Sequence, residues 1–374
     1  MPHVFGSKEL VEDVHQRELC IGCGACVDLC PYFKNYKGKT AQLFPCNLEQ
    51  GRCFTYCPKA EVDLDDIYQR TWGVPYEGSA LGPYQEIVAA KAGSIGADGS
   101  FQGGGSVSAL MAHAMKTGTL DAAVLTDKDL LNTQPCLVTR WEEVLDSAGS
   151  RFMSAPTLSG LNQGVRDGHQ KLGVVGTPCQ TLAVAQMRSN SLSNPEHQVP
   201  VALSIGLFCN WSLDSRQFTA LLGQKADIGT IRSMDIPPPP AKAMVLDTDA
   251  GSVEVSLSDI RPLIPQTCFT CLDLTSELAD VSVGMYEGRP GWNTLIIRSE
   301  KGAHQVAEAV KDGFLQTEAM PEDIIHHLSK AALAKKERSL RILIQRELIN
   351  TAKGRRASVR IPPAVMKKIL PERT

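Results

Sequence analysis

Four closely spaced cysteines near the N-terminus are the residues of this chain best suited to chemistry. They stand in Cys20-Ile-Gly-Cys23-Gly-Ala-Cys26-Val-Asp-Leu-Cys30-Pro31, which has the spacing Cys-x2-Cys-x2-Cys-x3-Cys-Pro. This spacing is typical of 4Fe-4S cluster ligation, in which the first three thiolates bind one cluster. Zinc is the alternative, but zinc motifs rarely place a third cysteine so close or end in Cys-Pro. The run therefore predicts an iron–sulfur site.

A second set of cysteines follows at Cys46, Cys53 and Cys57, and its end repeats the Cys-x3-Cys-Pro signature. In two-cluster ferredoxins the fourth cysteine of each run binds the cluster of the other run. This rule predicts one cluster held by Cys20, Cys23, Cys26 and Cys57. It predicts a second cluster to which Cys30, Cys46 and Cys53 contribute. The second run is irregular, because Asn47 and Gln50 stand where two cysteines are expected. The second cluster therefore uses an irregular loop or a non-cysteine ligand, or it is absent and its cysteines are buried thiols.

Length and composition give the setting for these motifs. A chain of 374 residues suits two or three cores, and a formal charge of -3 points to neither nucleic acid nor a membrane surface. No apolar run reaches the length of a membrane span, and the N-terminus lacks the basic and apolar regions of a signal peptide. Twelve cysteines in Cys-x2-Cys and Cys-Pro settings favour metal binding in a reducing compartment over disulfides. We expect a soluble, cytoplasmic iron–sulfur protein.

A glycine run divides a predicted strand over residues 84–92 from a predicted helix. Gly103, Gly104 and Gly105 lead directly into Ser106-Val-Ser-Ala-Leu-Met-Ala-His-Ala-Met-Lys116, whose apolar residues fall at helical spacing and which Gly118 caps. A glycine run at a helix N-terminus lets the backbone approach an anion closely and directs unpaired N–H groups toward it. The run is neither a dinucleotide-binding fingerprint nor a Walker loop. A phosphate-bearing cofactor and a simple tight turn both remain open.

Two single cysteines stand just beyond predicted strands. Residues 172–175 and 201–208 are short apolar segments, and Cys179 and Cys209 follow them. Open α/β sheets bind their ligands at this end of the strands. With Cys268 and Cys271 they make a set of four, enough for one more 4Fe-4S cluster. A structural role as buried thiols explains Cys179 and Cys209 equally well at this point. Cys136, which stands alone in the sequence, is interpreted as a packing residue.

The remaining segments carry weaker signals. Residues 61–78 look like an acidic connector rich in turns, and residues 244–257 alternate around Asp249-Ala-Gly251 as a β-hairpin does. A helical pattern begins at Glu322 and extends to about Lys353. Basic residues continue along it and into the tail: Lys335, Lys336, Arg338, Arg341, Arg346, Arg355, Arg356, Arg360, Lys367 and Lys368. We interpret this stretch as a solvated arm or a docking element for a partner subunit, since no aromatic residues interleave it as in nucleic-acid surfaces.

Six separated motifs resemble one known family in their order along the chain. They are Gly103-Gly-Gly-Ser-Val-Ser-Ala-Leu, Gly176-Thr-Pro-Cys-Gln, Gly206-Leu-Phe-Cys209, Cys268-Phe-Thr-Cys271, Glu277-Leu-Ala-Asp-Val-Ser-Val-Gly284 and Gly291-Trp-Asn-Thr294. Together they resemble the β-subunits of coenzyme F420-reducing hydrogenase and F420-dependent formate dehydrogenase, from about Tyr84 to about Arg298. The N-terminal segment looks like the ferredoxin-type extension of the formate dehydrogenase and F420H2 dehydrogenase branches.

The resemblance implies an α/β (α+β) flavin-binding core with an N-terminal bacterial-ferredoxin-like domain and a C-terminal helical arm. Expected boundaries are 1–80 for the ferredoxin-like domain, 81–320 for the core and 321–374 for the basic helix and tail. The core is expected to bind FAD with one 4Fe-4S cluster beside it, in addition to the N-terminal clusters. The resemblance makes that proximal cluster's ligands Cys179, Cys209, Cys268 and Cys271.

The resemblance also implies the residues that contact the flavin. Gly103, Gly104, Gly105, Ser106 and Ser108 would lie against FAD, at its diphosphate. Arg151 stands where family members usually carry lysine, and a cation there suits a phosphate. Less specific expectations on the flavin or substrate side are Thr177, Gln180, Trp292, Asn293 and Thr294. No acid or base residue is expected to be catalytic, because hydride transfer would belong to FAD.

The implied function is exchange of electrons between reduced coenzyme F420 and a partner enzyme such as hydrogenase, formate dehydrogenase or heterodisulfide reductase. Flavins suit this task because they connect two-electron hydride transfer with the one-electron chemistry of clusters. One alternative keeps the fold but uses ferredoxin or NADH in a bacterial complex. Others are the related reductases of chlorophyll pigments and a non-enzymatic electron-transfer subunit whose flavin pocket is empty. The preference for F420 rests on the resemblance alone.

Overall fold

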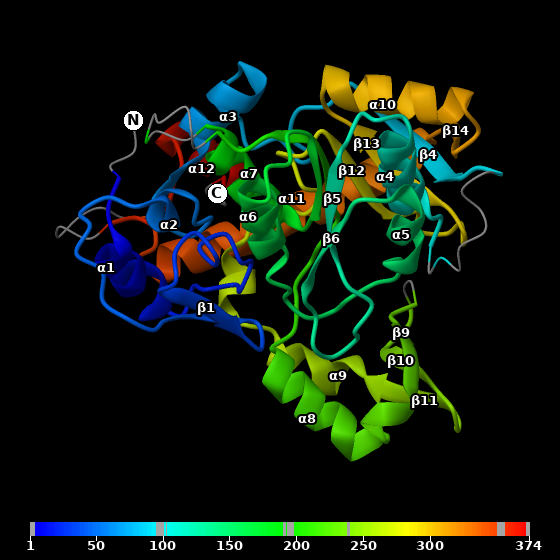
Figure 1. The fold of residues 1–374 in the computed structure, drawn as a ribbon, viewed down its shortest axis with the longest axis horizontal. Helices are drawn as coiled ribbons and strands as arrows, with labels where there is room; N and C mark the ends of the chain where they lie inside the picture. The colour runs from blue at the N-terminus through cyan, green and yellow to red at the C-terminus, as the bar shows by residue number, and fades with distance from the viewer. Residues whose placement is uncertain are drawn as a thin grey trace.

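A large mixed β-sheet forms the centre of the molecule (Figure 1). The computed structural model describes residues 4–94, 101, 103–189, 192, 198–237, 240–349 and 356–371. Within them, the sheet has eight strands in the order β14-β4-β13-β12-β8-β7-β5-β6. Their bounds in chain order are β4 (Glu86–Ala92), β5 (Ala122–Thr126), β6 (Pro135–Val138), β7 (Leu172–Gly176), β8 (Val201–Leu207), β12 (Val281–Met285), β13 (Asn293–Ile297) and β14 (Leu315–Ala319). The strands expected near 84–92, 172–175 and 201–208 are therefore confirmed.

The direction of the strands decides which residues share an edge. Strands β5, β7, β8 and β12 are parallel to one another, and β13 runs antiparallel to both β12 and β4. The carboxyl ends of β4, β5, β7, β8 and β12 consequently lie along one edge, and β13 begins at that edge. Ligands of open α/β sheets bind at this edge.

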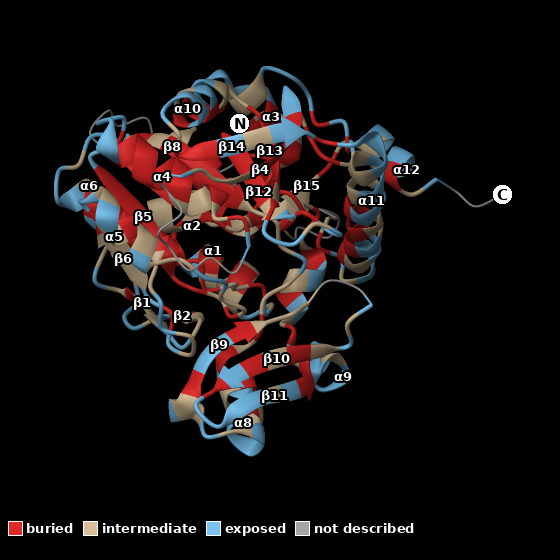
Figure 2. Ribbon diagram, turned by 90° about the vertical axis from the view of Figure 1, so that its right-hand side faces the viewer, coloured by how far each residue is buried: buried red, intermediate tan, exposed pale blue. Residues whose placement is uncertain are grey.

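Helices cover both faces of the sheet, which explains why its central strands are apolar throughout. Alternate residues of β5 point to opposite cores: Ala123 and Leu125 pack on one face, Ala122 and Val124 on the other. The first face is covered by α4 (Ser106–Lys116), α5 (Trp141–Asp146) and α10 (Glu300–Lys311), and the second by α6 (Thr157–Arg166) and α7 (Pro178–Arg188). Figure 2 shows these central strands as buried and the outer helix surfaces as exposed. The expected helix after the glycine run is thus confirmed as α4.

The N-terminal segment packs against the α6 and α7 side through Ala25 and Tyr56. It consists of α1 (Ser7–Leu10), a π-helical turn (Val11–His15), the hairpin β1 (Phe33–Tyr36) and β2 (Lys39–Gln42), α2 (Arg52–Thr55), β3 (Val62–Asp63) and α3 (Leu64–Trp72). The expectation of an irregular connector was wrong for residues 64–72. The Asp63 carboxylate accepts the N–H groups of Asp65 and Asp66, which caps α3 and turns the acidic stretch into a helix start.

A small subdomain lies apart from the large sheet at the lower end of the molecule (Figures 1 and 2). Its elements are α8 (Ser215–Lys225), a 3-10 turn (Ile228–Thr230), β9 (Ile231–Asp235), β10 (Ala243–Thr248), β11 (Gly251–Ser256), α9 (Leu257–Ile260) and a second 3-10 turn (Arg261–Leu263). Phe218, Leu246 and Val255 belong to a core of its own. Strands β10 and β11 pair from Ala243 to Ser256, which confirms the expected hairpin.

The C-terminal elements share a core with the N-terminal segment. They are α11 (Glu322–Gln345), β15 (Val359–Arg360), which pairs with β3, and α12 (Pro363–Ile369). Leu340 and Leu343 of α11 belong to the same apolar cluster as Phe54 and Tyr68. The boundaries near 80 and 320 stay predictions, and Lys353 and Arg355 lie outside the described residues. Within the described part of the chain, no helix has the length and apolar character needed to cross a bilayer.

The basic residues of α11 do not all behave as a solvated arm would. Lys335 and Lys336 are only 4% and 1% exposed, whereas Arg338 and Arg341 face solvent. Lys336 falls on the buried stripe of the helix with Ala332, Leu340 and Leu343. The solvated-arm interpretation is therefore corrected for the two lysines, because the apolar period of α11 turns them toward the protein interior.

Candidate functional site

Four cysteines of the N-terminal segment surround a cavity. Its lining includes Cys20, Cys23, Cys26 and Cys57, and its empty volume is about 330 Å³. We refer to these four residues as the middle group. The glycines between them let the loop wind tightly: a Cβ on Gly22 would lie 2.1 Å from the carbonyl oxygen of Gly38, and one on Gly24 would lie 2.4 Å from that of Pro156. Both have positive φ values, 67° and 85°, which glycine adopts readily. The structure thus brings together the four residues expected to share a cluster.

The thiols of the middle group influence one another electrostatically. Burial raises the pKa of Cys23 well above its ordinary value, and neighbouring Cys57 raises it further. Burial also raises the pKa of Cys57 to about 12. Buried thiols crowded in this way bind metal as thiolates, so that metal binding would release their protons. Cys179, from the distant β7–α7 turn, also raises the pKa of Cys23 and so lies near this group.

The outer group consists of Cys30, Cys46 and Cys53. Burial, together with Cys30 and Cys46, raises the pKa of Cys53 to about 11, and this influence places the three thiols close together. Cys53 in turn raises the pKa of Cys57, so the outer group adjoins the middle group. No fourth cysteine joins it among the described residues, which contain all twelve. The large apolar side chains of Leu43, Phe44 and Leu48 are exposed around Cys46 in the sequence.

The inner group consists of Cys179, Cys209, Cys268 and Cys271, and it lies at the carboxyl edge of the large sheet. Cys179 is the second residue of α7, directly after β7, and Cys209 follows β8. Cys268 lies within a 3-10 turn (Gln266–Thr270) and Cys271 ends it. Burial, together with Cys271 and Cys268 nearby, raises the pKa of Cys179 to about 12. The structure therefore gathers four cysteines that are as much as 92 positions apart in the chain (179 to 271).

Hydroxyl groups lie beside the sulfur atoms of the inner group. Thr177 Oγ1 lies 3.2 Å from Cys179 Sγ, and Ser212 Oγ lies 3.5 Å from Cys268 Sγ. Hydrogen bonds to cluster sulfurs are one of the means by which a protein sets a cluster's reduction potential. These hydroxyls are placed to donate such bonds.

Two buried lysines flank the inner group, and neither was expected from the sequence. Lys335 Nζ donates hydrogen bonds to the backbone oxygens of Cys209 at 2.6 Å and of Asp273 at 2.7 Å. Lys59 Nζ donates to Thr270 Oγ1 at 2.8 Å. Burial alone would lower the pKa of Lys335, but Cys271 and Cys209 beside it raise the value above that of an ordinary lysine. The helical spacing of apolar residues in α11 was the one sequence signal from which the burial of Lys335, and of its neighbour Lys336, could have been predicted.

A buried polar network adjoins the loop that follows Cys271. Glu277 accepts hydrogen bonds from Lys336 Nζ and from the Tyr68 hydroxyl, and Asp273 accepts the backbone N–H groups of Thr275 and Glu277. The network joins the α3 helix, the loop after Cys271 and α11. It fixes the loop that directly follows two of the four thiols, those of Cys268 and Cys271.

The cysteine groups suit multi-iron clusters better than single ions. Among the described residues, no three histidine, cysteine, aspartate or glutamate side chains converge closely enough to hold one metal ion. A 4Fe-4S cluster has a separate iron for each thiolate, so its ligands surround a volume and do not converge on a point. Thiolate is also the ligand that such clusters take.

The glycine run makes the tight turn expected between β4 and α4. Gly105 has a φ of 73°, and a Cβ on Gly104 would lie 2.5 Å from Asn293 Oδ1. The same oxygen accepts the backbone N–H of Ser106 at 3.3 Å. The Ser106 hydroxyl is fully buried and has no hydrogen-bond partner among the described residues. Close packing thus accounts for two of the glycines, whereas it leaves the hydroxyl at the start of α4 unexplained.

Several other predicted flavin contacts already have structural partners. Gln180 Oε1 accepts the N–H of Thr177 at 2.9 Å and completes the cap of α7. Arg151 Nε donates to the Asp127 oxygen, just past β5, at 2.9 Å. Thr294 Oγ1 donates to the Met285 oxygen at 3.3 Å.

Trp292 and Ser108 complete the set of predicted contacts. The Trp292 ring lies under the Lys91 ammonium at 4.7 Å and the Arg289 guanidinium at 3.8 Å. Ser108 is half-buried on α4. All these residues except Arg151 and Ser108 flank strand ends at the carboxyl edge, and their flavin roles stay predictions.

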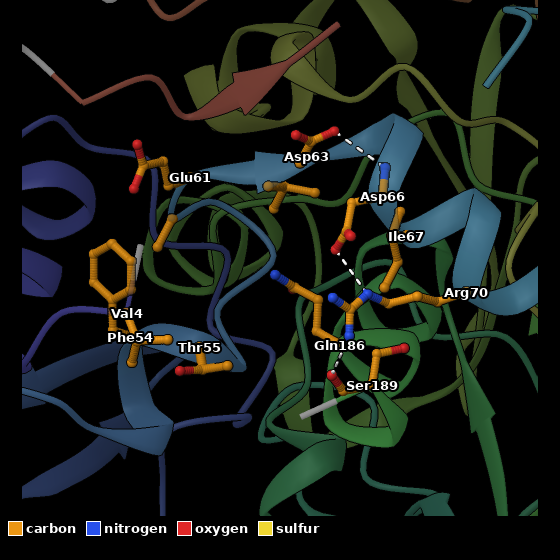
Figure 3. Close-up of a pocket in the computed structure, with 12 residues that line it drawn as sticks. Val4, Phe54, Thr55, Glu61, Asp63, Asp66, Ile67, Arg70, Gln186 and Ser189 are labelled. Atoms are coloured by element: carbon orange, nitrogen blue, oxygen red, sulfur yellow. Dashed lines mark hydrogen bonds and ion pairs between the residues drawn. The ribbon is translucent and has the colours of Figure 1, made fainter. Parts of the chain in front are cut away.

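A further cavity has no cysteine in its lining. It has an empty volume of about 510 Å³ and is lined by residues of the N-terminal segment, α3 and α7 (Figure 3). Arg70 crosses it from α3, pairing with Asp66 at 2.9 Å and reaching the Ser189 oxygen. It contains no cysteine, so it is not a cluster site.

Comparison with known proteins identifies the family. Residues 87–162 match the model described as coenzyme F420 hydrogenase/dehydrogenase, beta subunit N-term, and residues 169–323 match the corresponding C terminus model. Residues 14–32 match a 4Fe-4S binding domain. This chain belongs to the coenzyme F420 hydrogenase/dehydrogenase β-subunit family. The predicted resemblance and the N-terminal iron–sulfur motif are confirmed, and the protein is an electron-transfer subunit of an F420-linked oxidoreductase family.

Individual relatives agree with this assignment. An uncharacterised protein of Methanocaldococcus jannaschii is 30% identical over 333 residues, 82% of this chain and 91% of the relative. The coenzyme F420 hydrogenase subunit beta of Methanococcus voltae is 29% identical, with 71% of this chain and 96% of that subunit covered. A chain of the F420-reducing [NiFe] hydrogenase complex from Methanosarcina barkeri superposes with a TM-score of 0.65 at 26% identity, covering 71% of this chain and 93% of that one. The likeness confirms the mixed α/β core of this F420 hydrogenase/dehydrogenase family member.

Proposed function

We propose that this β-subunit family member binds FAD and up to three iron–sulfur clusters, and that it passes electrons between coenzyme F420 and a partner redox enzyme. The observation that carries the proposal is the shared position of the glycine turn and the inner cysteine group. Gly103–Gly105 follow β4, and Cys179 and Cys209 follow β7 and β8, all at the carboxyl edge of one sheet. A cofactor held at the turn would therefore lie on the same edge as the inner cluster.

The residues at the start of α4 fit the phosphate groups of FAD. A helix N-terminus attracts anions through its unpaired N–H groups and its dipole. The buried Ser106 hydroxyl, which has no partner in the described part of the chain, supplies a second and independent donor there. Asn293 holds the turn from the first residue of β13, so both elements would orient the cofactor. When bound, FAD would supply the conversion between hydride transfer and one-electron transfer.

The three cysteine groups support a path for single electrons. The inner group adjoins the middle group through Cys179 and Cys23, and the middle group adjoins the outer group through Cys57 and Cys53. The proposed path thus leads from the cofactor edge of the sheet to the exposed N-terminal segment. We place this chemistry in the cytoplasm, where reducing conditions keep such thiols available for metal.

A partner subunit would receive the electrons at the end of this path. Hydrogenase, formate dehydrogenase and heterodisulfide reductase are the classes of partner we propose, in keeping with the F420 hydrogenase and dehydrogenase names of the family models. The exposed cations of α11 and α12, among them Arg338, Arg341, Lys367 and Lys368, would contribute to docking. The proposed reaction requires no acid–base pair, because the hydride would pass directly between ring systems.

Anaerobic titration of the purified full chain tests the proposal. Bound flavin should bleach rapidly with reduced F420, with later changes at the wavelengths of the clusters. The control is the same titration with NADH and with reduced ferredoxin. If NADH or reduced ferredoxin bleaches the flavin while F420 stays inert, that carrier replaces F420 in the proposal. Absence of flavin from anaerobically purified protein, with iron present, would leave a simple electron-transfer subunit.

A further inference from the structure

Two buried lysines approach the inner cysteine group, and one of them, Lys59, also lines the cavity of the middle group. The thiols of the inner group come from four chain positions, and each end of its Cys268–Cys271 turn is approached by a buried ammonium group. Lys335 reaches it from α11, and Lys59 reaches it from the N-terminal segment. Both side chains are almost fully buried, with 4% and 6% exposure. A buried lysine without a negative partner is rare in proteins and costs free energy.

The hydrogen bonds of these two lysines do not include a carboxylate. Lys335 Nζ donates to the backbone oxygens of Cys209 and Asp273 at 2.6 and 2.7 Å. Lys59 Nζ donates to Thr270 Oγ1 at 2.8 Å and to the Thr267 oxygen at 3.4 Å. The adjacent Lys336, by contrast, pairs directly with Glu277. The negative charge near Lys335 comes from the thiolates of Cys271 and Cys209 together with the Asp273 carboxylate. Lys59 lies near Cys179 of the inner group and also near Cys57 of the middle group.

From this arrangement we infer that Lys335, with Lys59 as the weaker contributor, raises the reduction potential of the cluster held by the inner group. The inference rests on the proposed function, because it requires a 4Fe-4S cluster on these four thiolates. Four thiolates around an oxidised core of charge +2 give a net charge of −2, and one added electron makes it −3. A nearby fixed positive charge stabilises the reduced form more than the oxidised form.

The magnitude follows from Coulomb's law. A unit charge close to the cluster attracts the added electron through a medium whose effective dielectric constant is about 20. This favours the reduced form by roughly tenfold, which corresponds to about 59 mV for a one-electron couple. Lys335 is the stronger contributor, because its two hydrogen bonds end on the backbone of ligand Cys209 and of the loop that follows Cys271.

The functional reason is the position of the inner group on the proposed path. It would take each electron from the cofactor edge of the sheet before the middle and outer groups do. A raised potential makes that first one-electron step favourable. Neither lysine touches the proposed cofactor turn, so both act as positioning and electrostatic residues and not as catalytic ones.

The test is a redox titration of the reconstituted full chain, followed by electron paramagnetic resonance of the reduced clusters. Three variants separate charge from hydrogen bonding: Lys335→Met removes both, Lys335→Gln keeps a donor without charge, and Lys335→Arg keeps the charge. Lys330→Met, an exposed lysine on the same helix, is the matched control. We expect both neutral variants to lower one midpoint potential by an amount equivalent to about a tenfold loss of reduced cluster at fixed potential, and Lys335→Arg and Lys330→Met to leave it unchanged.

Different results would overturn different statements. An unchanged midpoint in Lys335→Met and Lys335→Gln, at full iron content, would overturn the inference and leave the proposed function intact. If no cluster signal of the wild-type chain disappears when Cys209 is replaced, the proposed function is overturned. If the Lys335 variants lose iron, Lys59→Met decides: a lowered midpoint of the same signal supports the inference, and an unchanged one refutes it.

Discussion

The inner and outer cysteine groups are built differently, although both are expected to hold iron–sulfur clusters. The inner group has four cysteines, lies at the carboxyl edge of the large sheet and is flanked by two buried lysines. The outer group has three cysteines on the N-terminal segment, and exposed Leu43, Phe44 and Leu48 stand around Cys46 in the sequence. The inner group thus has buried positive charge beside it, which suits a set potential, whereas exposed apolar residues near Cys46 of the outer group suit contact with a partner.

The largest expected effect is the loss of the inner cluster. Cys209→Ser removes one of four thiolates, and we expect the loss of about four iron atoms per chain. We also expect electron transfer from flavin to any acceptor to be lost. Cys136→Ser is the matched control, because Cys136 lies in β6 and packs against the apolar core. Iron and sulfide analysis with visible spectroscopy measures the outcome. Full iron content in Cys209→Ser would remove this residue from the ligand set.

Cys46→Ser tests the outer group and should have a narrower effect. We expect loss of the outer cluster alone, so that flavin bleaching by the hydride carrier keeps its rate while reduction of an external acceptor slows. Stopped-flow spectroscopy separates the two steps. The group has no fourth cysteine, so an unchanged iron content and acceptor rate would mean that its three thiols are structural and that the middle group is the last on the path.

The buried ion pair behind the inner group comes next. Burial alone would lower the pKa of Lys336, but the Glu277 carboxylate beside it raises the value above its ordinary range. Lys336→Met would leave Glu277 buried without its partner and should cost about 3–5 kcal/mol of unfolding free energy. Urea unfolding followed by circular dichroism measures the loss.

The double variant Lys336→Met/Glu277→Leu is the control for that measurement. Replacing both partners by apolar groups should recover much of the loss, because no unpaired charge remains. A double variant no more stable than the single one would show that the pair matters through its hydrogen bonds, including the one from Tyr68.

Asp280 offers a pH-dependent test in a region that touches no cluster. Burial alone would raise its pKa, but Arg188, Lys301 and the Ser204 hydrogen bonds outweigh burial and lower it. A carboxyl whose pKa is lower in the folded state stabilises the fold above its unfolded pKa of about 3.9, and this contribution disappears as pH falls through the folded value. Asp280→Asn should therefore cost about 2–3 kcal/mol near neutral pH, and the difference from wild type should shrink in acid. A difference independent of pH would contradict this assignment.

Much of the architecture could be predicted from the sequence because apolar period and turn residues act locally. The central strands, α4 with its glycine turn, and the β10–β11 hairpin follow from such signals. The helix α3 was missed because an acidic run reads as polar loop unless the Asp63 cap is recognised. The buried lysines were missed because they stand in a basic stretch, and only tertiary packing decides which cations of α11 face inward. Grouping of the cysteines required ligand-crossing and family patterns, since the residues of each group are distant in the chain.

The smallest expected effect concerns the hydroxyl of Ser106. Among the residues that the structure describes, this buried group lacks a partner, and such a group costs about 1–3 kcal/mol. Ser106→Ala should therefore leave the flavin-free protein as stable as wild type or slightly more so. If FAD phosphate lies at the start of α4, the same variant should weaken flavin binding about fivefold, because one hydrogen bond of about 1 kcal/mol is lost. Flavin fluorescence titration and thermal unfolding measure the two effects, with Ser329→Ala on α11 as control. The opposite signs are the decisive point: a site that is only a tight turn would gain stability without losing flavin affinity.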